Sequence, residues 1–391
     1  MQHFHSIISP VSEADFHANY FEKKPLLVQR NKPEYFSSLL TMDVMAKYLE
    51  RKDIVYPRIR IVKDGIQLPG PMYVKNSTVN GYVTEAIDNE KLFSLFEDGA
   101  SIVCQQLNVT FPSLYEFTQV LSNHFKSYVG LNTYLTPNTA QAFDPHYDAH
   151  DVFILQVHGS KIWRLYDMPE TAPVKRFDKK SWEMKAPSLE VELKQGDTLY
   201  IPRGLVHDAT TANNTSLHIT VGLSVDSWVD VFKSITEEAP SIERFRKTFN
   251  WDSVSADELK NTMRELVLEL VENADYGKIL ADFRLKHDKK NYEIHTGRFN
   301  DILTNKQLNN NSVVFLRKQV DTTLIKDAYS ITLSVRDKNL KFRLNEKELI
   351  DEILRTDQFS IGDLSNKYPK LAVIKNIQTL IKHGVLGVIT L

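Results

Sequence analysis

Two histidines and an aspartate, His146, Asp148 and His207, have the residue types and spacing of a metal site. The first two lie in the stretch FDPHYDAHDVFILQVHGSKIWRLY, and the third lies in LKQGDTLYIPRGLVHDAT. Two neutral imidazoles and one carboxylate are the ligands of the facial triad that binds non-haem Fe(II) and leaves coordination positions open. His-x-Asp alone occurs often by chance, but its combination with Gly-Asp and Pro-x-Gly-x-x-His is far more specific. The sequence therefore predicts an iron site, rather than two surface histidines and a loop aspartate.

The strand pattern around these residues explains how they would meet. His146 and Asp148 are two residues apart, so on an extended strand their side chains point to the same face. A Gln-Gly-Asp turn, a strand over residues 198–201 and a Pro-Arg-Gly stop precede His207. Strand-like runs dominate from 128 to 225, a density typical of a barrel. A barrel would place the start of one strand beside the end of another, and so bring the third ligand to the first two.

Together, the two segments resemble the two cupin motifs of the double-stranded β-helix oxygenases. The longer string PHYDAHDVFILQVHGSKIWRLY resembles the cupin-like JmjC ribosomal oxygenase family, and FHANYFEKKPLLVQR is similar to that family's opening segment. The resemblance is dense from about Phe16 to Trp228. It implies an Fe(II)- and 2-oxoglutarate-dependent oxygenase that hydroxylates a histidine or arginine side chain of a ribosomal protein. The implied fold class is α+β, with a double-stranded β-helix (cupin/JmjC) barrel, a helical dimerisation region and a C-terminal winged-helix domain.

The resemblance also implies which residues bind the iron and 2-oxoglutarate. His146, Asp148 and His207 match the iron ligands. Lys161 matches the basic residue that binds the distal carboxylate of 2-oxoglutarate, where a dianion needs a cation; the alternative is an ordinary lysine of a hairpin turn. Three further residues match polar positions of the co-substrate pocket: Asn132, Tyr134 and Thr220. His218 is expected to lie on the same strand face as Thr220. For these four residues, a satisfied polar group inside a barrel is an equally good interpretation.

His150 departs from the family's pattern. If the strand is regular, its side chain lies on the same face as those of His146 and Asp148. A fourth metal ligand is not expected, because the triad needs open positions for its co-substrates. We interpret His150 as a candidate substrate-side residue.

Composition and length agree with a large globular enzyme in a reducing compartment. A chain of 391 residues is expected to form two or three domains. Its net charge of −2 gives no indication of broad nucleic-acid binding. The single cysteine, Cys104, excludes internal disulfides and is expected to be a small buried hydrophobe. The N-terminus lacks the features of a secretory signal, and no apolar run approaches the ~18 residues of a membrane span. We therefore expect a cytoplasmic protein.

Three regions follow one another along the chain. Residues 1–226 are the expected JmjC/cupin catalytic domain with N-terminal helical elements. Two of these helices, SEADFHANYF and SLYEFTQVLSNHF, each open on a serine that can cap them. Residues 227–311 are the expected helical dimerisation region. There, Ser255 and Glu258 have capping-box spacing, and an apolar stripe follows on the same helix. The family's use of this region implies a homodimer, and packing of the stripe on the barrel is the alternative.

Residues 312–391 are the expected winged-helix domain. SVVFLRKQV and SITLSVRDKNLKFRLN are predicted strands, EKELIDEIL, SIGDLSNKY and KLAVIKNIQTLIKHG are predicted helices, and VLGVITL is a predicted final strand. Between residues 346 and 391, six basic residues are balanced by six acidic ones. Because phosphate contacts dominate DNA affinity, we expect no direct sequence-specific DNA binding. A structural or protein-contact role is favoured for this domain.

Three functional hypotheses remain from the sequence. The first is a 2-oxoglutarate oxygenase that acts on a ribosomal protein. The second is the same chemistry on another peptide or a small molecule, and the third is a non-catalytic cupin and winged-helix binding module. The intact triad together with Lys161 argues against the third. Lysine demethylation ranks below hydroxylation, because this near-neutral chain has no chromatin-reading motif.

Overall fold

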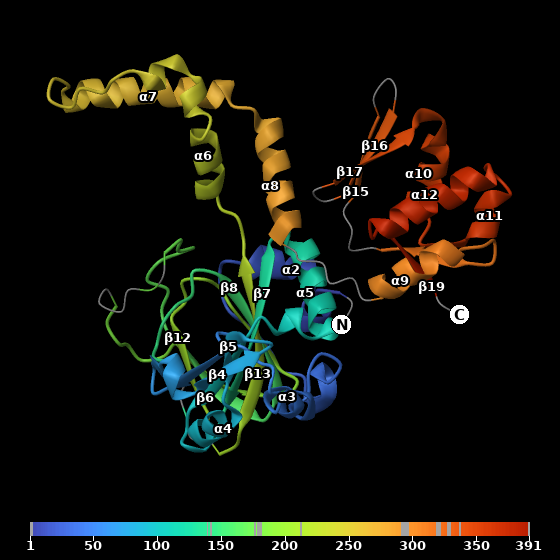
Figure 1. The fold of residues 1–391 in the computed structure, drawn as a ribbon. Coiled ribbons are helices and arrows are strands. Elements are labelled where there is room, and N and C mark those ends of the chain that lie inside the picture. Colours follow the sequence, from blue (N-terminus) through green and yellow to red (C-terminus); the bar gives the residue numbers. More distant parts are fainter. Residues whose placement is uncertain are drawn as a thin grey trace. The chain divides into compact units, whose positions relative to one another are not determined.

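The protein divides into two compact units, Met1–Val225 and Asp226–Leu391 (Figure 1). This computed structural model describes residues 3–389 except 139, 141–142, 176, 178–181, 212, 291–296, 318–321, 327–329 and 336–337. The expected division into 1–226, 227–311 and 312–391 stays a prediction, although its first boundary lies one residue from the division between the units.

Two antiparallel sheets form a barrel in the first unit. The larger sheet has the strand order β1-β11-β8-β13-β7-β6-β2-β3, and the smaller has the order β10-β9-β12. The bounds are β1 Leu26–Val28, β2 Ile59–Lys63, β3 Ile66–Gln67, β6 Ser101–Gln105, β7 Tyr128–Thr136, β8 Asp151–His158, β9 Ser160–Leu165, β10 Leu189–Lys194, β11 Thr198–Ile201, β12 His207–Thr210 and β13 Ser216–Ser224, with a separate hairpin of β4 Val74–Val79 and β5 Tyr82–Ile87. Both sheets contribute residues to one cavity, which therefore lies between them.

Successive side chains of strand β13 point alternately into the hydrophobic core and into the cavity. Leu217, Ile219 and Val221 are fully buried in the main hydrophobic core, on the outer face of the larger sheet. His218 and Thr220, the residues between them, line the cavity instead. The period of two therefore gives every long strand one apolar face and one face that can carry chemistry.

Helices pack on the outside of this barrel: α1 His5–Ile8, α2 Glu13–Asn19, α3 Met42–Leu49, α4 Asn89–Glu97 and α5 Pro112–Phe125. The predicted cap of α2 is confirmed, since the Ser12 side chain accepts the backbone N–H of Asp15. The predicted serine cap of α5 is wrong. Proline takes the first helical position of α5, where its missing N–H needs no partner, and the Ser113 hydroxyl donates to the carbonyl of Leu39. Cys104, on β6, is fully buried in the same core, as predicted.

The second unit begins with helices: α6 Trp228–Thr236, α7 Ala256–Asn273, α8 Tyr276–Lys290 and α9 Arg298–Thr304. The predicted capping box of α7 is confirmed, with Ser255 and Glu258 bonded reciprocally. Ile235, Leu270 and Ile279 bury one another in a small cluster between α6, α7 and α8. None of the helices that the structure describes is long and apolar enough to cross a bilayer.

The rest of the second unit has its own hydrophobic core, which includes Val314, Ile350 and Ile377. The expected strands and three helices are present, but β15 and β18 were not expected. Residues 318–320, 336–337 and 390–391 of the predicted strands lie outside the described residues. The bounds are β14 Val313–Leu316, β15 Thr322–Lys326, β16 Ser330–Val335, β17 Lys338–Arg343, α10 Lys347–Arg355, β18 Gln358–Ser360, α11 Ile361–Ser365, α12 Lys370–Lys382 and β19 Leu386–Ile389. The strands form two antiparallel sheets, β18-β14-β19 and β15-β16-β17. The winged-helix assignment stays a prediction.

A buried ion pair should contribute strongly to the stability of the second unit. The Asp301 carboxylate, 4% exposed, pairs with the guanidinium of Arg317 and accepts the Val388 backbone N–H at 2.8 Å. Asp301→Ala should lower the free energy of unfolding by about 3 kcal/mol, because it leaves a buried charge without its counter-charge. Denaturant unfolding followed by circular dichroism measures this. Asp43→Ala, which breaks an exposed pair with Lys47, is the control, and equal losses in both variants would contradict the prediction.

Candidate metal centre

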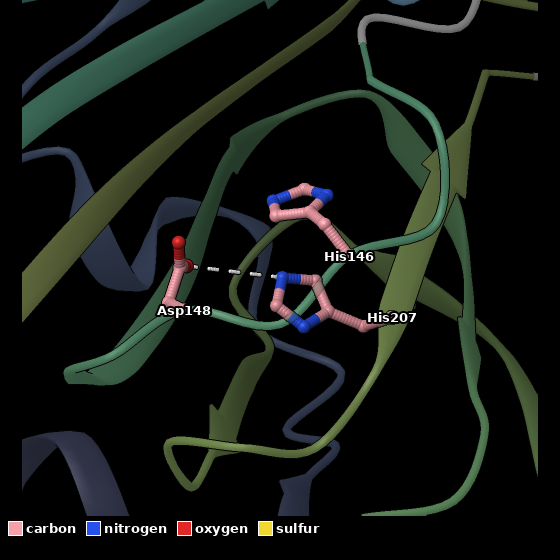
Figure 2. A group of neighbouring side chains, drawn as sticks. All are labelled: His146, Asp148 and His207. Atoms are coloured by element: carbon pink, nitrogen blue, oxygen red, sulfur yellow. Dashed lines mark ion pairs between the residues drawn. The ribbon is translucent and has the colours of Figure 1, made fainter. Parts of the chain in front are cut away.

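One ligand atom from each of His146, Asp148 and His207 points toward a common centre, as Figure 2 shows. These three atoms all lie within 4.8 Å of one another. The closest ion-pair distance, from His207 Nε2 to Asp148 Oδ2, is 3.9 Å. Metal–ligand bonds of about 2.1 Å would place neighbouring ligand atoms about 3 Å apart, so small side-chain shifts suffice to bind an ion. The structure thus brings together the three residues predicted from the sequence.

Backbone hydrogen bonds hold together the two segments that carry the triad. His146 and His207 form an isolated antiparallel bridge, with N–H to O distances of 3.1 and 2.8 Å. The N–H of Gly204 donates to the carbonyl of Asp148 at 3.1 Å. Gly204 has a φ of +89°, and a Cβ there would lie 2.0 Å from the carbonyl oxygen of Glu170. Only glycine fits this turn, which explains the Pro-x-Gly that precedes His207.

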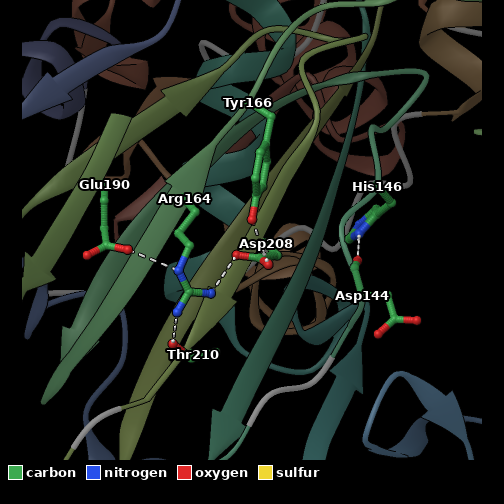
Figure 3. A network of polar contacts seen from close by, with 7 residues as sticks. All are labelled: Asp144, His146, Arg164, Tyr166, Glu190, Asp208 and Thr210. Atoms are coloured by element: carbon green, nitrogen blue, oxygen red, sulfur yellow. Dashed lines mark hydrogen bonds and ion pairs between the residues drawn. The ribbon is translucent and has the colours of Figure 1, made fainter. Parts of the chain in front are cut away.

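Two backbone carbonyls fix the tautomers of the histidines. Nδ1 of His146 lies 2.8 Å from the carbonyl oxygen of Asp144, a contact drawn in Figure 3, and Nδ1 of His207 lies 2.9 Å from that of Leu205. A carbonyl only accepts, so each Nδ1 donates and each Nε2 keeps its lone pair for a metal. Burial, reinforced by the neighbouring His146, lowers the pKa of His207 to about 4. His207 is therefore neutral at pH 7 and ready to bind a cation.

A cavity of about 270 Å³ opens onto the triad. Its volume is near the lower end of the range for small-molecule pockets, about 300–1,000 Å³. The lining residues come from β2, β7, β8, β9, β12 and β13 and the loop before β8: Arg60, Tyr134, Phe143, His146, Asp148, Val152, Ile154, Lys161, Trp163, His207, Asp208, Ala209, His218 and Thr220. A cavity of this size can hold a small molecule but not a nucleotide.

A family model described as the JmjC domain matches residues 106–231, a range that includes the whole triad. The chain contains a JmjC domain. Curated relatives include the bifunctional lysine-specific demethylase and histidyl-hydroxylase NO66 of Aedes aegypti, 34% identical over 233 residues. That match covers 58% of this chain and 35% of the relative. Ribosomal oxygenase 1 of Gallus gallus is 32% identical over 247 residues, which cover 60% of this chain and 39% of the relative. The chain thus spans less than half the length of these relatives.

Solved structures show a likeness in fold that covers both units. The ribosomal oxygenase YcfD from Escherichia coli, in complex with cobalt and succinic acid, aligns with a TM-score of 0.56 at 15% identity. The alignment covers 97% of this chain and 99% of YcfD. YcfD in complex with cobalt and 2-oxoglutarate aligns with a TM-score of 0.53 at 14% identity, over the same shares of the two chains. The predicted cupin/JmjC fold is confirmed, while the dimerisation region stays a prediction.

Lys161 forms one end of the JmjC domain's cavity. Its side chain is 2% exposed, and its Nζ donates to the hydroxyl of Thr136 at 3.0 Å. It forms no ion pair with any residue that the structure describes, and burial lowers its pKa to about 7. A buried ammonium without a counter-charge is costly, so this end of the cavity is suited to bind an anion.

Aromatic rings make the adjacent wall of the JmjC cavity. His218, 2% exposed, stacks on Tyr134 with ring centroids 5.0 Å apart and makes a T-shaped contact with Trp163, with centroids 5.6 Å apart. Burial, with Lys161 nearby, keeps the pKa of His218 well below its usual value. Nδ1 of His218 is buried without a hydrogen-bond partner in the described part of the chain. This wall is therefore neutral and can exclude water from the metal centre.

Asp208, the neighbour of His207, lines the cavity but is engaged elsewhere. Its two carboxylate oxygens accept from Arg164 and Tyr166, each at 3.1 Å (Figure 3). Arg164 also pairs with Glu190 at 3.1 Å. Asp208 is not in the group of ligand atoms. The network ties β12 to β9 and β10, and so supports the strand that begins at His207.

Three of the four residues predicted to bind the co-substrate line the cavity, and one does not. Lys161, Tyr134 and Thr220 line the JmjC cavity. Asn132 is not in the lining, and its side-chain oxygen accepts the backbone N–H of Gln106 at 3.2 Å. Their roles in binding 2-oxoglutarate stay predictions, although for Asn132 the structural interpretation has the better support.

Sequence reasoning missed two polar residues of the site. Thr136 lies on the same face of β7 as Tyr134, so the period of two could have found it. Arg60 lines the cavity from β2, far from the motifs, and its buried Nε has no partner among the described residues. No local pattern distinguishes Arg60 from an ordinary strand arginine.

Proposed function

We propose that this protein is an Fe(II)- and 2-oxoglutarate-dependent oxygenase that hydroxylates a histidine or arginine side chain of a ribosomal protein. The observation that carries the proposal is the pairing of two groups in one small cavity. A His-Asp-His triad with both Nε2 lone pairs available faces the same space as Lys161, a buried lysine that has no acidic partner among the described residues. The names of the matched relatives, a histidyl-hydroxylase and ribosomal oxygenases, support the reaction and the substrate class.

Different residues would bind the metal, bind the co-substrate and exclude water. When bound, Fe(II) with 2-oxoglutarate and O2 supplies oxidative decarboxylation coupled to hydroxylation of a C–H bond. His146, Asp148 and His207 would hold the metal on one side and leave the other side open. Lys161 would bind the distal carboxylate of 2-oxoglutarate, with Thr136 orienting its ammonium. The rings of Tyr134, Trp163 and His218 would exclude competing water.

Mass spectrometry of ribosomal proteins tests the proposed function. Proteins extracted from ribosomes of the source cells are incubated with the Fe(II)-loaded protein, 2-oxoglutarate and O2. We expect one histidine or arginine to gain the mass of one oxygen atom, with stoichiometric succinate. Succinate release without any modified ribosomal protein would assign the chemistry to another peptide or a small molecule. The absence of both products would refute the proposal.

We also propose that the protein forms a homodimer through its helical region. Trp228 and Phe232, one helical turn apart on α6, are 86% and 47% exposed, and Met263 on α7 is 43% exposed. Along the apolar stripe of α7, Leu270 is buried and Leu266 and Val267 are half-buried, whereas Leu259 and Met263 are exposed. Exposed aromatic clusters of this kind are typical of protein interfaces.

Sedimentation equilibrium should detect this dimer and its loss. The double variant Trp228→Ala with Phe232→Ala should weaken association by more than about 100-fold, the loss of about 3 kcal/mol expected from truncating two aromatic anchors. Tyr82→Ala is the control, because Tyr82 is 79% exposed on the β4–β5 hairpin of the first unit. A wild-type monomer, or a dimer insensitive to the α6 substitutions, would contradict this arrangement.

A further inference from the structure

We infer that His150 contacts the substrate side chain that is hydroxylated and selects it by hydrogen bonding. The His150 ring packs directly on the backbone of Gly222. This inference rests on the proposed oxygenase function and adds a specificity residue to it. It also explains why β13 carries a glycine in mid-strand.

A side chain at Gly222 would collide with the ring of His150, whereas the backbone conformation itself does not call for glycine. A Cβ at Gly222 would lie 2.6 Å from Cδ2 and 2.8 Å from Nε2 of His150. Its φ is not positive, so the backbone there could accept any residue. Glycine in a strand interior weakens the strand and often marks a close approach by another group. The imidazole therefore occupies the place that a side chain would take.

His150 is not one of the residues that line the cavity, but its ring packs on the inner face of β13 next to the cavity, on the side away from Lys161. Along the inner face of β13, His218 stands near Lys161, Thr220 follows, and Gly222 comes last. Gly222 pairs with Val152 of β8, which also lines the cavity. If 2-oxoglutarate takes the Lys161 side of the metal, the side near His150 stays available for the substrate side chain.

His150 has the chemistry to recognise a nitrogen-bearing side chain. The residue is half-buried, and its ring nitrogens make no hydrogen bond with any residue that the structure describes. It does not belong to the group of metal-ligand atoms. A neutral imidazole offers one donor and one acceptor, which match an imidazole or a guanidinium of the substrate. Polar contacts of this kind discriminate far better than apolar ones, because a wrong substrate leaves them unpaired.

Two glycines on facing strands provide a matched pair of test variants. Gly130 of β7 is directly opposite Gly222 of β13. A Cβ at Gly130 would meet only Tyr128, at an ordinary 3.5 Å. Gly222→Ala should displace the His150 ring and lower kcat/KM for the ribosomal protein substrate about tenfold, whereas Gly130→Ala should leave it unchanged. His150→Ala should cause the same loss, and His150→Gln should recover part of it by restoring an amide donor.

A double-mutant cycle separates this role from general damage to the strand. In the His150→Ala background, Gly222→Ala should not lower kcat/KM any further, because the ring that the new Cβ would displace is absent. Binding of Mn(II) with 2-oxoglutarate, followed by tryptophan fluorescence, should persist in every variant, since Trp163 reports on the cavity. Wild-type kcat/KM in His150→Ala, or additive losses in the double variant, would overturn the inference and leave the proposed function standing. A wild type that neither consumes 2-oxoglutarate nor modifies ribosomal protein would remove the proposed function, and this inference with it.

Discussion

His146→Ala should lower 2-oxoglutarate turnover by more than about 100-fold, the upper limit seen when a residue that only supports a metal ligand is lost. The reason is the geometry of the triad. His146 Nε2 keeps a lone pair because Nδ1 donates to the Asp144 carbonyl, and among the described residues only His207 and Asp148 share the group of ligand atoms with it, so no further histidine can replace it. Succinate formation by the Fe(II)-loaded protein measures the loss, and the metal content of the purified variant should fall with it.

His158→Ala is the matched control for this prediction. His158 lies in the same sequence motif as His146 but is exposed, at the end of β8. Its replacement should leave turnover and metal content at wild-type levels. Equal losses in the two variants would indicate a general effect of histidine removal on the fold. Full activity of His146→Ala would exclude it as a ligand.

Lys161→Ala should raise KM for 2-oxoglutarate about 100-fold, with a smaller change in kcat. The buried ammonium is the charged partner expected for the distal carboxylate, and charged hydrogen bonds contribute about 1.5–3 kcal/mol each. The same residue predicts a pH dependence. Because burial lowers the pKa of Lys161 to about 7, the cation needed for binding is present below that pH and is lost above it. The value of kcat/KM for 2-oxoglutarate should therefore fall as the pH rises through about 7.

Lys161→Arg distinguishes this titration from others in the site. A guanidinium stays charged at all accessible pH values, so the variant should lose the fall above pH 7 even if its affinity is lower. Initial rates at varied 2-oxoglutarate and pH measure both effects. A pH profile that is identical in Lys161→Arg and the wild type would assign the titration to another group. An unchanged KM in Lys161→Ala would place the distal carboxylate elsewhere.

The metal triad could be predicted because its signal is local and redundant. His-x-Asp is one motif, and the glycine turn before His207 supplies a second. The regular strand predicted under His146, Asp148 and His150 is wrong, because β8 begins only at Asp151 and the ligands precede it on an isolated bridge and a loop. The barrel followed from the density of short strands, and the α7 cap from a serine and a glutamate three residues apart. In each case, the deciding residues are close together in the sequence.

The rest of the site depends on backbone and long-range contacts that side-chain patterns do not encode. The carbonyls of Asp144 and Leu205 fix the histidine tautomers, yet any residue could supply them. Arg60 reaches the cavity only because β2 is joined through β6 to β7. Ser113 follows a proline that takes the helix start, so its capping potential was overridden by a neighbour. The need for Gly222 appears only when the ring of His150 is placed against it.

Anaerobic titration of the protein with Fe(II) in the presence of 2-oxoglutarate tests the central claim most directly. We expect one Fe(II) per chain and a visible charge-transfer absorption that appears only when both are added. His207→Ala should abolish the absorption, and Lys161→Ala should shift its appearance to higher 2-oxoglutarate concentrations. A folded wild-type protein that binds no Fe(II), or an absorption that survives the loss of His207, would contradict the assignment of this site.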